Sequence, residues 1–71
     1  MEEKLKEIFF KVLGDYDFDK KQQDYEKWDS FAHMELVSEV ESKFGVVLNA
    51  DEVVEINSAK NFVELIKKKN A

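Results

Sequence analysis

The sequence of 71 residues contains no cysteine, which excludes disulfide bonds, cysteine-based zinc sites and thiol nucleophiles. It contains one histidine, His33, so most histidine-dependent catalytic arrangements are excluded as well. No apolar run approaches the roughly 20 residues that a membrane helix needs. The N-terminal residues Met1-Glu2-Glu3-Lys4 do not resemble a signal peptide. These absences predict a soluble, cytoplasmic protein with no membrane partner.

The length of the chain predicts a single domain, residues 1–71, with a modest core. A chain of this size buries only about 60% of its unfolded surface, which leaves little room for a deep active-site cleft. No nucleophile–base pair is apparent, and no apolar pocket that would shift a carboxyl pKa. We therefore expect that the chain is not an enzyme. We also expect it to be a monomer.

The acidic residues are concentrated in the middle of the chain. The net charge is −5, and the only lysine or arginine between positions 29 and 56 is Lys43. Such a region repels nucleic acids and anionic membranes and attracts basic protein surfaces. The charge pattern therefore predicts protein partners and no nucleic-acid partner.

Helical spacing of apolar residues predicts an all-α fold. In the first segment Leu5, Ile8 and Phe9 recur at the spacing of one helical face, continued by Val12 and Leu13. Similar patterns follow later in the chain. We expect a small four-helix bundle, with three main helices and one short helix between the second and the last, over residues 2–13, 30–44, 50–56 and 59–69.

Helix-terminating residues support these boundaries. Gly14 and Gly45 follow the first two helices as C-caps. Asp29, Asn49 and Ser58 precede the second, third and fourth helices as N-caps. The glutamate three residues after Asn49 completes a capping box.

Two connections lack a helical pattern. The long one, residues 15–28, is expected to fold Tyr16, Phe18 and Tyr25 inward. Residues 46–48 are apolar but too short and isolated to form a strand.

The segment Asp29-Ser30-Phe31 at the start of the second helix is the main candidate site. Taken alone, it is compatible with simple helix capping. It is followed, however, by Glu35-Leu36-Val37 and Phe44-Gly45-Val46, and then by the short and last helices. This order resembles the acyl carrier proteins over essentially the whole chain, with Phe31 in place of the family's leucine.

The resemblance implies a defined chemistry. A phosphopantetheinyl transferase would attach 4′-phosphopantetheine from coenzyme A to the Ser30 hydroxyl, and Asp29 would assist attachment. The thiol of the arm would then carry an acyl or aminoacyl group as a thioester. The expected partners are this transferase, a loading enzyme and downstream biosynthetic enzymes with basic docking patches.

The resemblance also implies a docking surface on the second helix. Glu35, Glu39 and Glu41 would face basic patches of partner enzymes, and Met34 and Val37 would add apolar contacts. The alternatives are an ordinary solvated face for the glutamates and core packing for Met34 and Val37.

Two departures from the family suggest a specialised, freestanding member. The common fatty-acid type has glycine two residues before the aspartate, where this chain has Lys27, followed by Trp28. His33 lies one turn after Ser30, and it is either near the arm or an ordinary helix histidine. The pathway is therefore open among fatty-acid, polyketide and other specialised syntheses. The alternative function is a small helical protein-interaction module that is not phosphopantetheinylated.

The first loop contains a coincidental metal-ligand spacing. Asp15, Asp17, Asp19 and Glu26 fall at the first, third, fifth and twelfth positions of a calcium loop. The glycine that such a loop needs at its sixth position is Lys20, so we expect no metal site.

Overall fold

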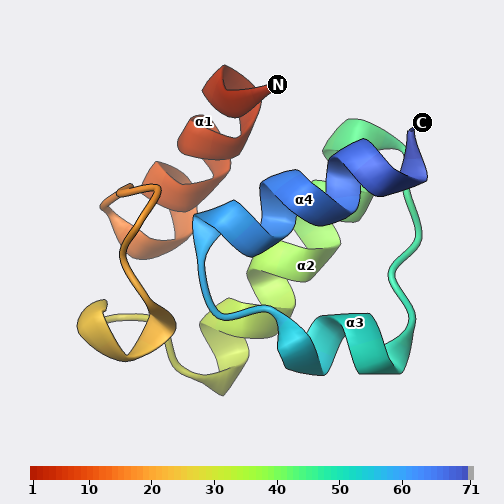
Figure 1. Cartoon of the computed structure of the whole chain (residues 1–71). Coiled ribbons are helices and arrows are strands. Elements are labelled where there is room, and N and C mark those ends of the chain that lie inside the picture. Colours follow the sequence, from red (N-terminus) through yellow and green to blue (C-terminus); the bar gives the residue numbers. More distant parts are fainter. Residues whose placement is uncertain (71) are drawn as a thin grey trace.

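The computed structural model describes residues 1–70 as four α-helices joined by loops (Figure 1). The helices are α1 (Glu2–Leu13), α2 (Ser30–Phe44), α3 (Ala50–Glu55) and α4 (Ala59–Lys69), and one 3-10 turn, η1, spans Gln22–Asp24. Within residues 1–70 there is no strand, and the single isolated β-bridge joins Lys21 to Ser58. The predicted all-α bundle is confirmed. The short helix ends one residue earlier than expected, and η1 was not predicted.

The N-caps are those that the sequence indicates. The side chains of Asp29, Asn49 and Ser58 accept the backbone N–H three residues further on, at 2.8, 2.9 and 3.2 Å. Glu52 returns the interaction by accepting the backbone N–H of Asn49 at 2.9 Å. The start of α2 is therefore set by Asp29, and that of α3 by a capping box.

The C-terminal ends of α1 and α2 depend on glycine. Gly14 and Gly45 have φ values of 72° and 64°, in the left-handed region that other residues rarely adopt. After Gly45, Val46 and Leu48 are buried while Val47 is 78% exposed. The connection to α3 therefore lies against the core on alternate residues without pairing as a strand, as expected.

The apolar faces of the helices meet in one core centred on aromatic rings. Phe9 of α1 and Phe62 of α4 are fully buried, with ring centroids 5.9 Å apart in an edge-to-face arrangement. Trp28 packs against Phe9 at 5.6 Å, also edge to face. Such distances are those of closely packed aromatic pairs. Other fully buried side chains are Leu5, Leu36, Val40, Ile56 and Ile66.

The long connection before α2 is tied to the core by its aromatic residues, as predicted. Tyr25 is buried, and its hydroxyl donates to the carbonyl of Asp17 at 3.0 Å and accepts the N–H of Asp17 at 2.9 Å. Burial raises the pKa of Tyr25. Tyr16 and Phe18 are partly buried and pack against the same core.

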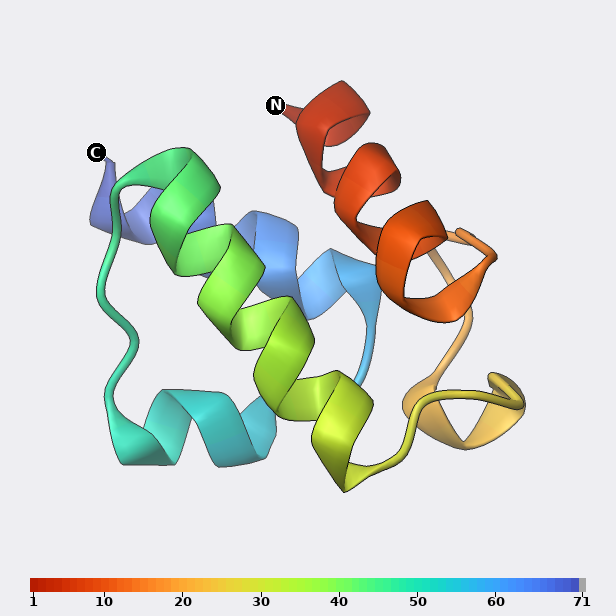
Figure 2. The ribbon, with the colours of Figure 1, turned by 180° about the vertical axis from the view of Figure 1, so that it is seen from behind.

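The start of α2 lies at the end of the molecule away from both termini (Figures 1 and 2). The loop containing η1 and the short helix α3 lie at this same end. The loop also contacts the connection between α3 and α4, because the N–H of Gln22 donates to the carbonyl of Asn57 at 2.6 Å. The loop that precedes α2, the helix α3 and the connection that follows α3 therefore lie around the beginning of α2. None of the helices formed by residues 1–70 has the length and apolar character needed to span a membrane.

Candidate functional site: the start of helix α2

Ser30 is the first residue of α2 and is exposed to solvent. The preceding residue, Asp29, has extended backbone geometry, and its Oδ1 accepts the N–H of Ala32 at 2.8 Å. This bond closes the helix end with the aspartate side chain and leaves the serine side chain outside it. Among the described residues, no hydrogen-bond partner engages the Ser30 hydroxyl, so it is available to an external group.

The environment of Ser30 suits a phosphodiester. The first N–H groups of a helix have no partner within the helix, and the helix dipole places partial positive charge there. An anion attached at the first turn is therefore favoured. The exposed Ser30 hydroxyl thus fits covalent attachment of a phosphate-linked arm.

Trp28 and His33 form a hydrogen-bonded support beneath this site. Trp28 is 5% exposed, and its Nε1–H donates to Nδ1 of His33 at 3.0 Å. The two rings also stack, with centroids 5.9 Å apart. Nε2 of His33 lies 2.7 Å from the carbonyl oxygen of Val53 in α3. Because Nδ1 accepts the hydrogen bond from Trp28, the ring carries its proton on Nε2. This N–H donates a hydrogen bond to the carbonyl oxygen of Val53.

This support defines the surroundings of both residues. Trp28 is buried rather than displayed to a partner, and His33 holds the loop to α2 and α3 rather than pointing freely towards the arm. Both side chains position Ser30 by anchoring the chain just before and just after it.

An apolar surface surrounds Ser30. Phe31 is 86% exposed, Met34 is 57% exposed, and Val54 of α3 is 81% exposed. An open hollow of about 370 Å³ lies on the surface where α2 meets α3, lined by Gln22, Ser30, His33, Met34, Val53 and Val54. Exposure of three large apolar side chains around one serine is unusual enough to indicate a contact surface.

Phe31 and Val54 were not among the predicted docking residues. The available signal was that both lie off the apolar stripe of their helices, although this alone does not separate a contact residue from an incidental exposed one. Phe31 follows Ser30 directly in the sequence, whereas the closeness of Val54 to Ser30 becomes apparent only when α3 is placed beside α2.

The predicted docking residues separate into three groups: exposed, buried, and half-buried with partners within the chain. Glu35 and Met34 are exposed. Val37 is 4% exposed and packs in the core, so its proposed surface role is wrong; its position on α2 turns it towards the other helices.

Glu39 and Glu41 are half-buried and engaged within the chain. Glu39 lies 3.1 Å from Lys11 of α1. Glu41 accepts the N–H of Leu48 at 2.9 Å and so holds the connection that follows α2. Of the three glutamates, Glu35 is therefore the one whose carboxylate is free of such contacts among the described residues.

The acids of the first loop are occupied by local interactions. Asp15 lies 2.9 Å from the ammonium of Lys20, and this hydrogen bond is the main cause that lowers the pKa of Asp15. Asp17 accepts the N–H of Asp19 at 3.0 Å. Over residues 1–70, no three histidine, cysteine, aspartate or glutamate side chains are grouped so as to hold a metal ion.

A four-helix bundle with an exposed serine at the start of its second helix, whose hydroxyl has no hydrogen-bond partner among the described residues, has the architecture of a small carrier domain. A protein-family model described as a phosphopantetheine attachment site matches residues 3–66. The chain belongs to this family, as its resemblance to the acyl carrier proteins indicated, and its cofactor is covalently attached 4′-phosphopantetheine. No curated protein and no solved structure gives a significant match.

Proposed function

We propose that Ser30 bears the phosphopantetheine arm and that the protein carries acyl or aminoacyl groups for partner enzymes. The observation that carries this proposal is the exposure of Ser30 at the first turn of α2, with Asp29 supplying the cap in its place. The family match supports the carrier role as such. The pathway, whether fatty-acid, polyketide or another specialised synthesis, is set by the enzymes that load the carrier.

The attachment reaction needs only a nucleophilic hydroxyl from this chain. In the transferase complex, the Ser30 oxygen attacks the pyrophosphate phosphorus that bears pantetheine in coenzyme A. A new P–O bond forms, the bond to adenosine 3′,5′-bisphosphate breaks, and the serine proton passes to a base of the transferase. The second carboxylate oxygen of Asp29, beyond the one that caps the helix, would help to hold magnesium there. When attached, the arm supplies a thiol that carries a carboxylic acid as a thioester.

The surface around Ser30 supports docking of partner enzymes by apolar and acidic contacts. Phe31 and Met34 of α2 and Val54 of α3 provide exposed apolar area, and Glu35 provides a free carboxylate on α2. A partner with a basic rim around an apolar patch would match it. We propose that the chain acts in this way as a cytoplasmic monomer and catalyses no step itself.

The direct test is the mass of the intact protein after incubation with coenzyme A, magnesium and a broad-specificity phosphopantetheinyl transferase. We expect one arm per chain in the wild type and none in Ser30→Ala. Ser38→Ala is the matched control, because Ser38 is another exposed serine of α2 and should leave attachment unchanged.

An unmodified wild type would favour the alternative function, a helical interaction module without an arm. Equal modification of the wild type and Ser30→Ala would show that Ser30 is not the attachment residue.

A further inference from the structure

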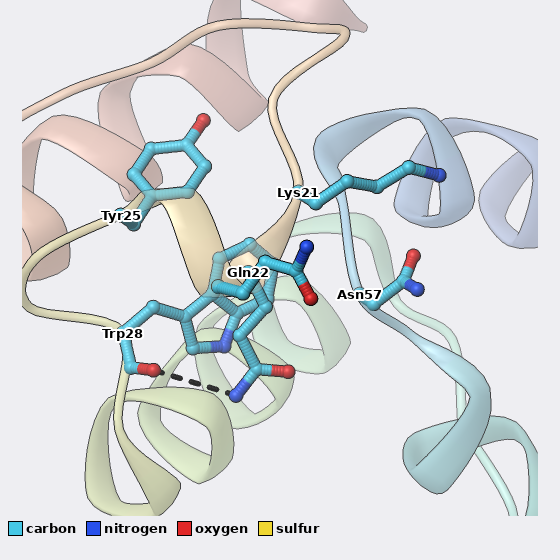
Figure 3. Close-up of a pocket in the computed structure, with 6 residues that line it drawn as sticks. Lys21, Gln22, Tyr25, Trp28 and Asn57 are labelled. Atoms are coloured by element: carbon cyan, nitrogen blue, oxygen red, sulfur yellow. Dashed lines mark hydrogen bonds between the residues drawn. The ribbon is translucent and has the colours of Figure 1, made fainter.

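A second hollow lies between the loop before α2 and the connection from α3 to α4 (Figure 3). Its volume is about 520 Å³, and its lining consists of Lys21, Gln22, Gln23, Tyr25, Trp28 and Asn57. In Figure 3, Lys21 and Asn57 lie on one side and the rings of Tyr25 and Trp28 on the other, with Gln22 between them.

The lining of this hollow differs in charge from the rest of the protein. The chain has a net charge of −5, yet the described residues that line the hollow include no carboxylate. Lys21 has no ion-pair partner among residues 1–70, whereas its neighbour Lys20 is paired with Asp15 at 2.9 Å. An anion in the hollow would therefore meet an uncompensated positive charge.

Side-chain amides supply further donors. Nε2 of Gln22 donates to the carbonyl of Trp28 at 3.4 Å, which is a long hydrogen bond (Figure 3). Within residues 1–70, the side-chain amides of Gln23 and Asn57 donate to no protein group. Amide N–H groups and an ammonium together suit a carboxylate, which only accepts hydrogen bonds.

The hollow is within reach of an arm on Ser30. Gln22 also lines the smaller hollow beside Ser30, so one side chain borders both. Trp28 precedes Ser30 by two residues, which places their Cα atoms within about 7 Å of each other. A flexible arm from Ser30 can therefore pass Gln22 and place its end over Trp28.

The core, by contrast, is closed at this end of α2. Trp28 and Val53 are joined through His33 by hydrogen bonds of 3.0 and 2.7 Å. Behind Trp28 lies Phe9, whose ring is in edge contact with it at 5.6 Å. A long apolar cargo entering between the loop and α3 would have to break both hydrogen bonds. A short polar cargo resting outside the core would break neither.

We propose that the polar hollow receives the end of a short acyl cargo that bears a free carboxylate, with Lys21 as its ionic partner. This inference rests on the proposed function, because the cargo reaches the hollow on the arm of Ser30. It assigns a cargo class, short dicarboxylic monothioesters, that the family match does not specify.

The experiment compares two cargoes of equal carbon number on the full chain. The transferase is supplied with glutaryl-coenzyme A or pentanoyl-coenzyme A, and intact mass verifies loading on Ser30. Nitrogen–proton NMR then follows the side-chain amides of Gln22, Gln23 and Asn57. We expect glutaryl loading to shift these signals relative to the unloaded arm and pentanoyl loading to leave them in place. The indole N–H of Trp28 should keep its position in both, because it remains bonded to His33.

Lys21→Gln tests the ionic partner, and Lys27→Gln is its matched control. Lys27 is a nearby exposed lysine outside the lining of this hollow. Lys21 pairs with Ser58 through its backbone, so the substitution leaves that bridge available. We expect Lys21→Gln to reduce the glutaryl-dependent shifts about two- to fivefold, the range of an exposed ion pair, and Lys27→Gln to retain them.

The outcomes separate this inference from the proposed function. Loading without glutaryl-specific shifts, or equal effects of both lysine variants, would overturn the cargo class while leaving Ser30 as the attachment residue. Movement of the Trp28 indole signal by pentanoyl would show that apolar cargo enters the core. That result would also overturn the assigned cargo class. A chain that takes no arm would overturn the proposed function and this inference together.

Discussion

Phe31 and Val37 are apolar residues of the same helix with opposite surroundings. Phe31 is 86% exposed beside Ser30, whereas Val37 is 4% exposed in the core. Phe31→Ser should therefore change the free energy of unfolding by no more than about 0.5 kcal/mol, but lower kcat/KM for the transferase severalfold. Val37→Ala should lower the free energy of unfolding by about 2 kcal/mol and leave kcat/KM of the folded protein unchanged.

Urea denaturation followed by Trp28 fluorescence measures the free energy of unfolding. Steady-state kinetics of arm attachment from coenzyme A measure kcat/KM for the transferase. Unchanged attachment kinetics in Phe31→Ser would remove Phe31 from the docking surface used by the transferase.

His33 joins the loop, α2 and α3 through the two ring nitrogens. His33→Ala would leave the indole N–H of the buried Trp28 without its acceptor, a loss of about 1–3 kcal/mol in the free energy of unfolding. His33→Gln retains one acceptor and one donor, so its loss should be smaller. Denaturation midpoints of the two variants provide the comparison. Equal losses would mean that His33 contributes by packing alone.

The sequence predicted Ser30 and Asp29 at the start of α2 but not the contacts beneath them. The Trp28–His33 bond crosses the helix cap, and the His33–Val53 bond depends on how α3 lies against α2. Neither arrangement follows from helical periodicity. The same reason explains Val37, whose burial depends on which helices surround α2.

At the scale of elements, the short helix α3 is held to α4 by an ion pair. The ammonium of Lys69 lies 2.8 Å from Oε1 of Glu52, the same oxygen that accepts the N–H of Asn49. The hydrogen bond from Lys69 is the main cause that lowers the pKa of Glu52 below its ordinary 4.5. Because the pKa is lower in the folded chain, this interaction stabilises the fold above pH 4.5 and is lost as the pH falls through the folded value.

Glu52→Gln should therefore be less stable than the wild type at neutral pH, and the difference should shrink as the pH falls well below 4.5. Glutamine can still accept the Asn49 N–H, so the variant isolates the charge. Glu55→Gln, an exposed change in the same helix, is the control. The measurement is the urea midpoint at each pH. A difference that persists unchanged in acid would show that the charge of Glu52 is not its cause.

Helix boundaries were the most predictable part of the fold. The ends of α1 and α2 coincide with Gly14 and Gly45 because only glycine adopts the left-handed geometry at little cost. The starts of α2, α3 and α4 coincide with side chains that accept an N–H group of the first turn. Such local interactions are present in the sequence itself. η1 depends instead on the bond from Gln22 to Asn57, a contact between distant segments.

At the scale of the whole molecule, the acidic residues in the middle of the chain act through their combined electrostatic potential rather than through single contacts. Between positions 29 and 56 Lys43 is the only lysine or arginine, and Glu35 is exposed on the helix that begins with Ser30. Glu35→Lys should lower kcat/KM of attachment by about two- to fivefold at low salt. The effect should decline as added salt shortens the screening length to about 10 Å or less.

Glu64→Lys is the matched control because it makes the same charge change at an exposed residue of α4 rather than of α2. If both variants lose activity equally, net charge and not the face around Ser30 determines docking. If neither does, electrostatic docking to this transferase is absent.

The placement of both chain ends away from the start of α2 has a practical consequence (Figure 2). A tag or a surface linker joined before α1 projects from the opposite end of the bundle, so Ser30 stays accessible when the protein is immobilised. An immobilised chain could then be charged, washed and offered to successive enzymes, with each acyl group remaining covalently linked to the surface between steps.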